Sequence, residues 1–409
     1  MIAAASKCGR NWGTNLSKPG LALLLALILP GAAVSAPERP ASAVLAPVLA
    51  PVPALVARVP VVLLVDMDAG QILYSREATR RFLPASMTKA MSALVAFDLI
   101  AGGKLREDQR VTVDAATARQ WSGKGTSLFL AAGDEITVTD LVRGMTTVSA
   151  NDASVVLARG ALGSTEAWTA QMNAQAKRLG MKDSHFATPN GWPDSGATYV
   201  SAADLVRLAE ALIYRHPALY RRYFGHAAMD WNGSTLTNHD PFVGVVPGAD
   251  GIKTGHTFEA GFNFLGTAER GGRRLVMVTA GAQNADLRAK ASRDLLEWGY
   301  SAWDSRILAG EGTRIGSARV QGGDARSVTL LAPRRFTVAV PKGGNPAITA
   351  RIVYHGPLRA PIPKGAVVAE LEVQIAGQPR NRLPLAAAAS IGTAGPLDRL
   401  INGLAGLVS

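Results

Sequence analysis

Segments with the alternating pattern of β-strands lie on both sides of a long helical region in this 409-residue chain. Val59–Val65 and Gln71–Tyr74 come before it, and apolar residues at helical spacing dominate from residue 114 to about residue 213. Strands in such an order share a sheet only if that sheet is assembled from both ends of the segment. The pattern therefore predicts one α+β domain, which we place at 58–305. The later strands are expected at 252–257, 262–268 and 274–280, with a closing helix at 289–298.

The pattern changes after about residue 307, where short strand-like segments alternate with Gly- and Pro-rich turns. No cluster of histidines or carboxylates accompanies them. The pattern predicts a small all-β domain at 306–385 that serves as a spacer or a binding surface. Its strands are expected at Ser327–Leu331, Phe336–Val340, Ala350–Tyr354 and Val367–Ile375.

The first 36 residues have the pattern of a secretory signal peptide. Lys7, Arg10 and Lys18 precede an apolar core at 21–29, and Val34-Ser35-Ala36 is a small-residue cleavage site. The core is too short to favour a membrane-spanning helix, although an uncleaved anchor is the alternative. The chain is thus predicted to be exported, to a periplasm or the outer face of the cytoplasmic membrane. Residues 37–57, rich in Ala and Pro, are predicted to form an extended linker.

Composition and charge narrow the classes of ligand. Cys8 is the only cysteine and lies in the signal segment, so the exported chain would have no disulfide and no thiolate ligand. His185, His239 and His256 are scattered, which does not favour a metal site, and we expect no cofactor. The net charge of +12 favours anionic lipid headgroups or cell-wall polymers, although a generally basic surface is an equal alternative. No zinc spacing or RNA-binding signature indicates a nucleic acid.

The last part of the chain, 386–409, is predicted to be a tail with an amphipathic helix that begins near Pro396. Such a helix at the end of an exported chain suggests an interfacial membrane anchor, and docking on its own domain is the alternative. Gly403 and Gly406 weaken the helix. Its apolar face would consist of Leu397, Leu400, Ile401, Leu404, Leu407 and Val408.

Ser86 and Lys89 provide the first chemical motif. They stand three positions apart at the start of the apolar run 90–100, and residues i and i+3 of a helix share a face. A lysine of lowered pKa can take the proton of a serine, and a helix start offers N–H groups to an oxyanion. Alone, Ser-x-x-Lys is also typical of a capped helix with a solvated lysine.

Two further motifs support a catalytic role. In Ser149-Ala150-Asn151, a hydroxyl and an amide could relay a proton and hold a substrate amide. In Lys253-Thr254-Gly255, on an expected strand, a cation and a hydroxyl could receive a carboxylate, and the glycine allows close approach of the backbone. These motifs, in this order, are the signature of penicillin-binding proteins and class A β-lactamases, with Ala150 here in place of Asp.

From about residue 59 to 303, the chain resembles the serine-type D-alanyl-D-alanine carboxypeptidases, the low-molecular-mass penicillin-binding proteins. The resemblance rests on the extended motifs at 83–89, 148–153, 185–191 and 250–257, and no clear Glu-x-x-x-Asn deacylation motif of class A β-lactamases is present. It implies a penicillin-binding-protein/β-lactamase-like transpeptidase fold, with an antiparallel sheet flanked by helices and a helical subdomain. The β-rich domain and amphipathic tail also match this family's layout.

The resemblance implies a role for each motif residue. Ser86 would attack the penultimate D-Ala carbonyl, Lys89 would be the general base, and Ser149 would relay the proton to the departing amine. Asn151 would hold the substrate, and Lys253 would support the electrostatics of the site.

The remaining implied contacts involve the backbone and the terminal carboxylate. The N–H groups of Ser86 and His256 would form the oxyanion hole, next to Gly255. Thr254 and Arg288 would receive the carboxylate, although Arg288 could instead be a surface cation near a helix start.

The implied substrate is the peptidoglycan stem peptide, with β-lactams as covalent inhibitors and a role in cell-wall synthesis and cell shape. Asp240 stands where many relatives have Asn, which leaves substrate preference open. A D,D-endopeptidase that cuts cross-links would use the same residues. A β-lactamase would need fast deacylation, and a wall-binding protein with an inactive site remains the non-enzymatic alternative.

Overall fold

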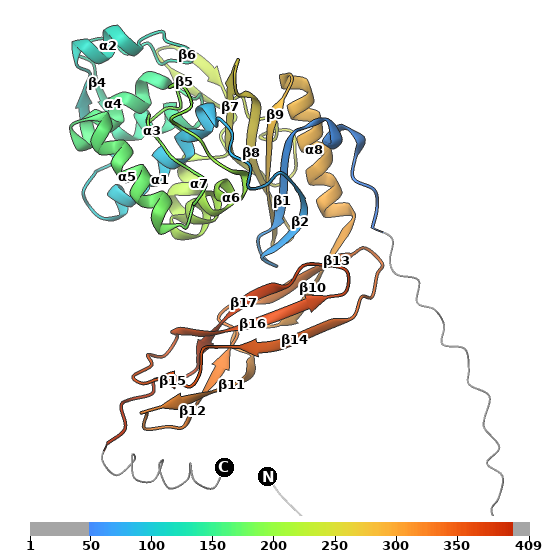
Figure 1. Cartoon of the computed structure of the whole chain (residues 1–409). Coiled ribbons are helices and arrows are strands. Elements are labelled where there is room, and N and C mark those ends of the chain that lie inside the picture. The colour runs from blue at the N-terminus through green and yellow to red at the C-terminus, as the bar shows by residue number, and fades with distance from the viewer. Residues whose placement is uncertain (1–48, 396–409) are drawn as a thin grey trace, which may run out of the picture. The chain divides into compact units, whose positions relative to one another are not determined.

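The computed structural model describes residues 49–395, and its first part contains a five-stranded antiparallel sheet (Figure 1). The strand order β2-β1-β9-β8-β7 joins two early strands to three late ones. The prediction of a sheet assembled from both ends of the segment is confirmed. The strands are β1 (Val61–Asp66), β2 (Gln71–Arg76), β7 (Ala249–Thr257), β8 (Gly261–Arg270) and β9 (Arg273–Ala282).

The alternation of side chains along β1 explains why both faces of the sheet are covered. Val61 and Leu63 belong to the core that contains α1 (Thr88–Ala101) on one face, and Val62 and Leu64 pack with α8 (Ala285–Ser301) on the other. Figure 1 shows α8 on one side of the sheet and the other α-helices opposite. Because α1 lies inside the domain, its apolar residues surround the helix rather than forming a stripe.

The helices α3 (Val138–Thr146), α5 (Thr165–Arg178) and α6 (Ala202–Glu210) pack against α1. Side-chain caps begin several of the helices, as where Asp114 accepts a hydrogen bond from the N–H of Thr117 at the start of α2 (Ala115–Trp121). The expected helix over 202–213 is α-helical only to residue 210 and continues as a π-helical turn, η3 (Ala211–Arg215). The other helices are α4 (Asn151–Leu162) and α7 (Pro217–Tyr223). Two small sheets have two strands each: β3 (Arg110–Thr112) pairs with β4 (Glu135–Thr137), and β5 (Ala228–Trp231) pairs with β6 (Ser234–Thr237).

Part of the expected extended linker is folded onto the domain. Residues 54–58 form the 3₁₀-helix η1 (Ala54–Arg58), with Val56 fully buried, and the indole N–H of Trp298 donates to the carbonyl of Ala50 at 2.8 Å. The Val and Leu side chains between the prolines bury apolar surface against α8, which an extended tether would leave in water. The earlier linker residues lie outside the described residues.

The second part is the expected all-β domain. A six-stranded sheet has the order β14-β16-β17-β12-β11-β15, and β10 pairs with β13. The domain extends beyond the expected limit of 385, because Leu385 and Ala387 of β17 and then Ile391 are buried in its core. The predicted amphipathic helix lies outside the described residues. The strands are β10 (Trp303–Ala309), β11 (Arg314–Gln321), β12 (Ser327–Leu331), β13 (Phe336–Pro341), β14 (Ile348–Val353), β15 (Leu358–Arg359), β16 (Val367–Ile375) and β17 (Asn381–Ala387).

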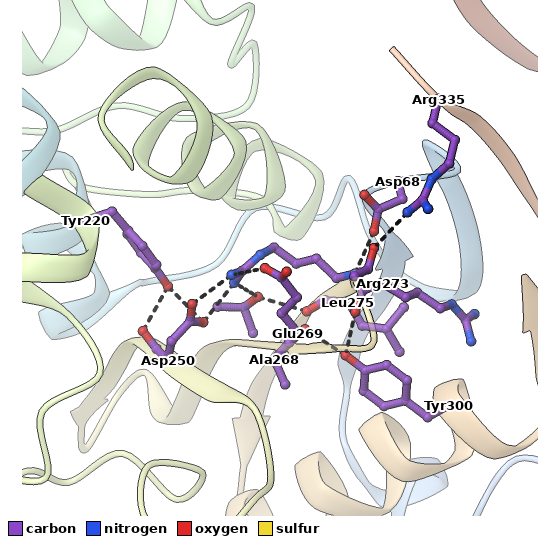
Figure 2. A network of polar contacts seen from close by, with 12 residues as sticks. Asp68, Tyr220, Asp250, Ala268, Glu269, Arg273, Leu275, Tyr300 and Arg335 are labelled. Atoms are coloured by element: carbon purple, nitrogen blue, oxygen red, sulfur yellow. Dashed lines mark hydrogen bonds and ion pairs between the residues drawn. The ribbon is translucent and has the colours of Figure 1, made fainter. Parts of the chain in front are cut away.

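A polar network fixes the beginning of β7. Arg274 of β9 donates to both carboxylate oxygens of Asp250 at 2.8 Å and to Glu269 at 2.7 Å. The hydroxyl of Tyr220 on α7 donates to the carbonyl of Asp250 at 2.9 Å (Figure 2). The network joins α7 and three strands immediately before Lys253 on β7.

We expect Arg274→Met to lower the free energy of unfolding by about 3 kcal/mol, because it leaves Asp250 and Glu269 without their shared, largely buried partner. Urea denaturation would measure this loss. Arg106→Met is the matched control, because Arg106 and Asp108 form an exposed pair whose loss should cost less than about 1 kcal/mol. Equal effects of the two substitutions would contradict a stabilising role for the network.

Candidate active site

The centre of the site is the contact between Ser86 and Lys89. Ser86 lies in η2 (Ala85–Met87), a 3₁₀ turn that leads directly into α1, so Lys89 stands one turn later on the same side. The Lys89 ammonium donates to Ser86 Oγ at 2.7 Å, to Asn151 Oδ1 at 2.8 Å and to the carbonyl of Asn190 at 2.8 Å. The structure thus joins the first two motifs through one lysine.

Burial changes the acidity of Lys89. Its side chain is completely buried, which lowers its pKa well below the ordinary value, and the nearby charge of Lys253 lowers this pKa further. Asp152 acts in the opposite direction. A lysine that loses its proton this readily can accept the proton of the serine hydroxyl 2.7 Å away.

The backbone around the nucleophile is held in an unusual conformation. Ala85, immediately before Ser86, has φ of +49°, and Ser149 has φ of +69°. Both values lie in the left-handed region that residues other than glycine rarely adopt. Each such residue costs about 1–3 kcal/mol and persists only where the surroundings enforce it. Gly191 packs so closely here that a Cβ would lie 1.9 Å from the carbonyl oxygen of Ala85.

The second motif lies at the start of α4. Asn151 is the first residue of that helix; its Oδ1 accepts from Lys89, and its Nδ2 donates to the carbonyl of Lys124 at 3.0 Å. Ser149 is nearly buried beside it. Asn151 therefore connects the general base to the loop that follows α2.

Sequence reasoning missed two groups that complete this arrangement. Asp152 is buried and accepts from Ser127 Oγ at 2.6 Å and from the N–H of Leu128 at 3.0 Å, which holds the loop after α2 against α4. Asn190 supplies a carbonyl to Lys89. Both residues stood in the quoted motifs, but only tertiary contacts show what they do.

The third motif runs along β7, at the edge of the sheet. A Cβ on Gly255 would lie 2.2 Å from the carbonyl oxygen of Pro84, so only glycine lets this strand approach the turn that carries Ser86. Lys253 and Thr254 are buried next to this contact, and the ring of His256 stacks on Phe262 with centroids 3.9 Å apart.

Arg288 and Asp240 complete the charged part of the site. Arg288 in the first turn of α8 is 8% exposed, so it is not a surface cation; its Nη2 donates to the carbonyl of His239 at 3.4 Å, and its Nε is buried without a partner among the described residues. Asp240 is buried too. Its Oδ1 accepts from the N–H of Phe242 at 2.7 Å, while Oδ2 has no partner in the described part of the chain.

These buried groups shift one another's pKa values. Burial lowers the pKa of Lys253 to about 7, although Asp240 opposes this shift, and Arg288 adds to it. Burial raises the pKa of Asp240 to about 6, against the effect of its backbone hydrogen bonds and of Lys253 and Arg288. The pKa of His239 is lowered by burial and by the same two cations. Below pH 7, Lys253 and Arg288 give the pocket two cations against the single carboxylate of Asp240, which suits a carboxylate ligand.

We expect Asp240→Asn to move the descending limb of the kcat/KM pH profile to lower pH by about half to one unit. The charged form of Lys253 favours an anionic substrate, so kcat/KM should fall as pH rises through the pKa of about 7. Removing the Asp240 charge lowers that pKa, because a neighbouring anion no longer stabilises the ammonium. Asp230→Asn, at an exposed carboxylate on β5, should leave the limb in place; an unshifted limb in Asp240→Asn would contradict the coupling.

Within residues 49–395, no group of three or more His, Cys, Asp or Glu side chains could hold a metal ion. The groups that lie together around Ser86 support one kind of reaction. A hydroxyl, a buried amine, an amide and a pocket with two cations, Lys253 on β7 and Arg288 on α8, can support nucleophilic attack on a carbonyl next to a carboxylate.

Known proteins with similar sequences belong to a family of D-alanyl-D-alanine carboxypeptidases. The family model described as D-alanyl-D-alanine carboxypeptidase matches residues 51–284, and the model of the penicillin-binding protein 5 C-terminal domain matches residues 303–393. The D-alanyl-D-alanine carboxypeptidase DacD of Salmonella typhimurium is 35% identical over 342 residues, which cover 82% of this chain and 87% of the relative.

Solved structures show the same fold. Penicillin-binding protein 5 from Haemophilus influenzae has a TM-score of 0.72 at 29% identity, covering 82% of this chain and 98% of that chain. Penicillin-binding protein D2 from Listeria monocytogenes, solved in its ampicillin-bound form, has a TM-score of 0.54 at 29% identity, covering 60% of this chain and 98% of that chain. The predicted transpeptidase-like fold is thus confirmed, and the chain belongs to the D-alanyl-D-alanine carboxypeptidase family.

Proposed function

We propose that this protein removes the terminal D-Ala from peptidoglycan stem peptides through an acyl-enzyme on Ser86. The observation that carries the proposal is the 2.7 Å hydrogen bond between Ser86 Oγ and Lys89, a completely buried lysine whose pKa is well below its ordinary value. The family membership supports the same reaction.

In the acylation step, neutral Lys89 takes the proton of Ser86, and Oγ attacks the penultimate D-Ala carbonyl. The N–H groups of Ser86 and His256 stabilise the oxyanion of the tetrahedral intermediate. Ser149 relays a proton to the departing amine, the C–N bond breaks, and D-Ala leaves. Water then attacks the ester with Lys89 as the base, which restores the Ser86 hydroxyl.

Different residues of the site bind the two ends of the scissile dipeptide. Asn151 holds the peptide amide, while Thr254 and Arg288 receive the terminal carboxylate in the field of Lys253. Gly255 keeps β7 close enough for its backbone to contact the substrate. A β-lactam presents a reactive amide and a carboxylate in a similar arrangement, so it would acylate Ser86 and remain bound.

We further propose that residues 1–36 direct export and that the enzyme works in the periplasm or at the outer face of the cytoplasmic membrane. The linker would begin at residue 37 and the catalytic domain at about 58. The β domain would run from about 306, and the tail helix would contact the membrane surface. No helix within residues 49–395 is long and apolar enough to cross a membrane.

The test uses the chain from Pro37 onward with a fluorescent penicillin, a pentapeptide ending in D-Ala-D-Ala, and a cross-linked muropeptide dimer. We expect covalent labelling and D-Ala release, both prevented by prior incubation with unlabelled ampicillin. Labelling with cleavage of the dimer but without D-Ala release would favour the endopeptidase. No labelling and no release would leave a wall-binding protein.

A further inference from the structure

The amine of Lys89 is held by groups from separate segments of the chain. Besides Ser86, it donates to Asn151 Oδ1 and to the carbonyl of Asn190, which lie 62 and 101 residues further along the sequence. Neither acceptor belongs to α1, so the position of the amine depends on how these two segments are held. A misplacement of about 1 Å in a reacting group can cost about 10²-fold in rate.

Each of the two asparagines is fastened by one further residue. The side-chain amide of Asn151 donates to the carbonyl of Lys124 at 3.0 Å, and Oδ1 of Asn190 accepts from the N–H of Trp192 at 3.0 Å. Both asparagines are buried. The contacts of the general base therefore lead outwards to the loop after α2 and to the segment that carries Trp192.

A cation between two indole rings joins these two segments. The rings of Trp121 and Trp192 meet edge to face with centroids 5.8 Å apart, and the Lys124 ammonium lies 4.8 Å from each centroid. Both distances are within the range of a cation–π interaction. Trp121 is the last residue of α2, so the Trp–Lys–Trp cluster of Trp121, Lys124 and Trp192 connects that helix to the segment after Asn190.

The backbone next to Lys124 lies directly against Asn151. Gly125 has φ of +65°, and a Cβ at this position would lie 2.8 Å from Asn151 Nδ2 and 3.0 Å from the ring of Trp192. Only glycine allows the loop to fit between these two residues. Any movement of the loop at Lys124 would therefore reach Asn151 without an intervening residue.

We propose that Lys124 is a positioning residue for the general base Lys89: its ammonium, held between the two indole rings, keeps both asparagine acceptors in contact with the Lys89 amine. The inference rests on the proposed function and adds to it a residue that lies outside the catalytic motifs. Lys124 acts through the two asparagines and takes no part in the proton transfer.

Loss of the cluster should change the acidity of Lys89. Burial is the main cause that lowers the pKa of Lys89; the charge of Lys253 lowers it further, and Asp152 raises it. A loosened loop would admit water to the amine, so this pKa should rise towards its ordinary value. Acylation needs the neutral amine, and its ascending limb should therefore move to higher pH.

The test measures acylation by a fluorescent penicillin as a function of pH. Lys124→Met should lower the rate at neutral pH by about three- to tenfold and move the ascending limb to higher pH by about half to one unit, which matches the loss of one or two cation–π contacts. Lys124→Arg should remain within about twofold of the wild-type rate, because a guanidinium also binds over indole rings.

Trp121→Leu separates the cluster from its charge. This variant keeps the Lys124 ammonium, so lost repulsion between two cations cannot explain a shift, and its ascending limb should move in the same direction. Lys104→Met is the matched control, because Lys104 is an exposed lysine shortly after α1 and should leave the pH profile unchanged.

An ascending limb at the wild-type pH in both Lys124→Met and Trp121→Leu would overturn the positioning role. A lower melting temperature of these variants without that shift would likewise overturn it, since it would show a contribution to stability alone. Absence of both labelling and D-Ala release in the wild type would instead overturn the proposed function itself.

Discussion

Replacing Ser86 with alanine is expected to eliminate labelling by fluorescent penicillin and to lower D-Ala release by at least about 10⁴-fold. The substitution removes Oγ, the only protein atom that the proposal places in the acyl-enzyme ester bond. It leaves Lys89 in contact with Asn151 and Asn190, so the fold should persist. Intact-protein mass after exposure to penicillin, together with the rate of D-Ala release, would measure both effects.

Ser122→Ala is the control for this experiment, since Ser122 is an exposed serine at the end of α2. It should retain the wild-type rates of labelling and release. An adduct of the same mass on the Ser86→Ala protein would show that another group is the nucleophile. Thermal melting of both variants would separate loss of chemistry from loss of fold.

Replacing Lys89 with arginine or methionine should lower the acylation rate by about 10³-fold, close to the usual contribution of a general base. Arginine keeps a cation and hydrogen-bond donors but cannot release its proton, whereas methionine removes the charge. Both variants therefore lack a base beside Ser86. Stopped-flow labelling with a fluorescent penicillin would measure the rate.

The pH dependence distinguishes a base from a merely structural lysine. Lys89 must be neutral to act, so wild-type acylation should rise with pH through its lowered pKa, whereas residual acylation in the methionine variant should lack this limb. Lys182→Arg, at an exposed lysine, should match the wild type. Acylation by the arginine variant within tenfold of the wild-type rate would contradict the general-base role.

Much of the fold could be predicted because it depends on local patterns. The strands Ser327–Leu331 and Val367–Ile375 begin and end where their alternation predicts. The linker was harder to interpret, since the same Ala-, Pro- and Val-rich composition suits a tether or a 3₁₀ turn packed on α8. The end of the β domain was also misplaced, because burial of Leu385 and Ile391 depends on partners elsewhere in the chain.

The sequence by itself determined which side chains could meet within one element. Ser86 and Lys89 lie on the same side of the chain because three residues make nearly one helical turn. This relation needs no knowledge of distant residues, whereas the contact of Gly255 with Pro84 depends on the tertiary fold.

Only the tertiary structure decided how these groups behave. It places the Asn190 carbonyl on Lys89 and buries Asp240 near Lys253 and Arg288. The pKa of a group depends on lost hydration and on charges that approach through space, and both come from residues far apart in the chain. The motifs therefore predict the reacting groups, while the fold determines their protonation.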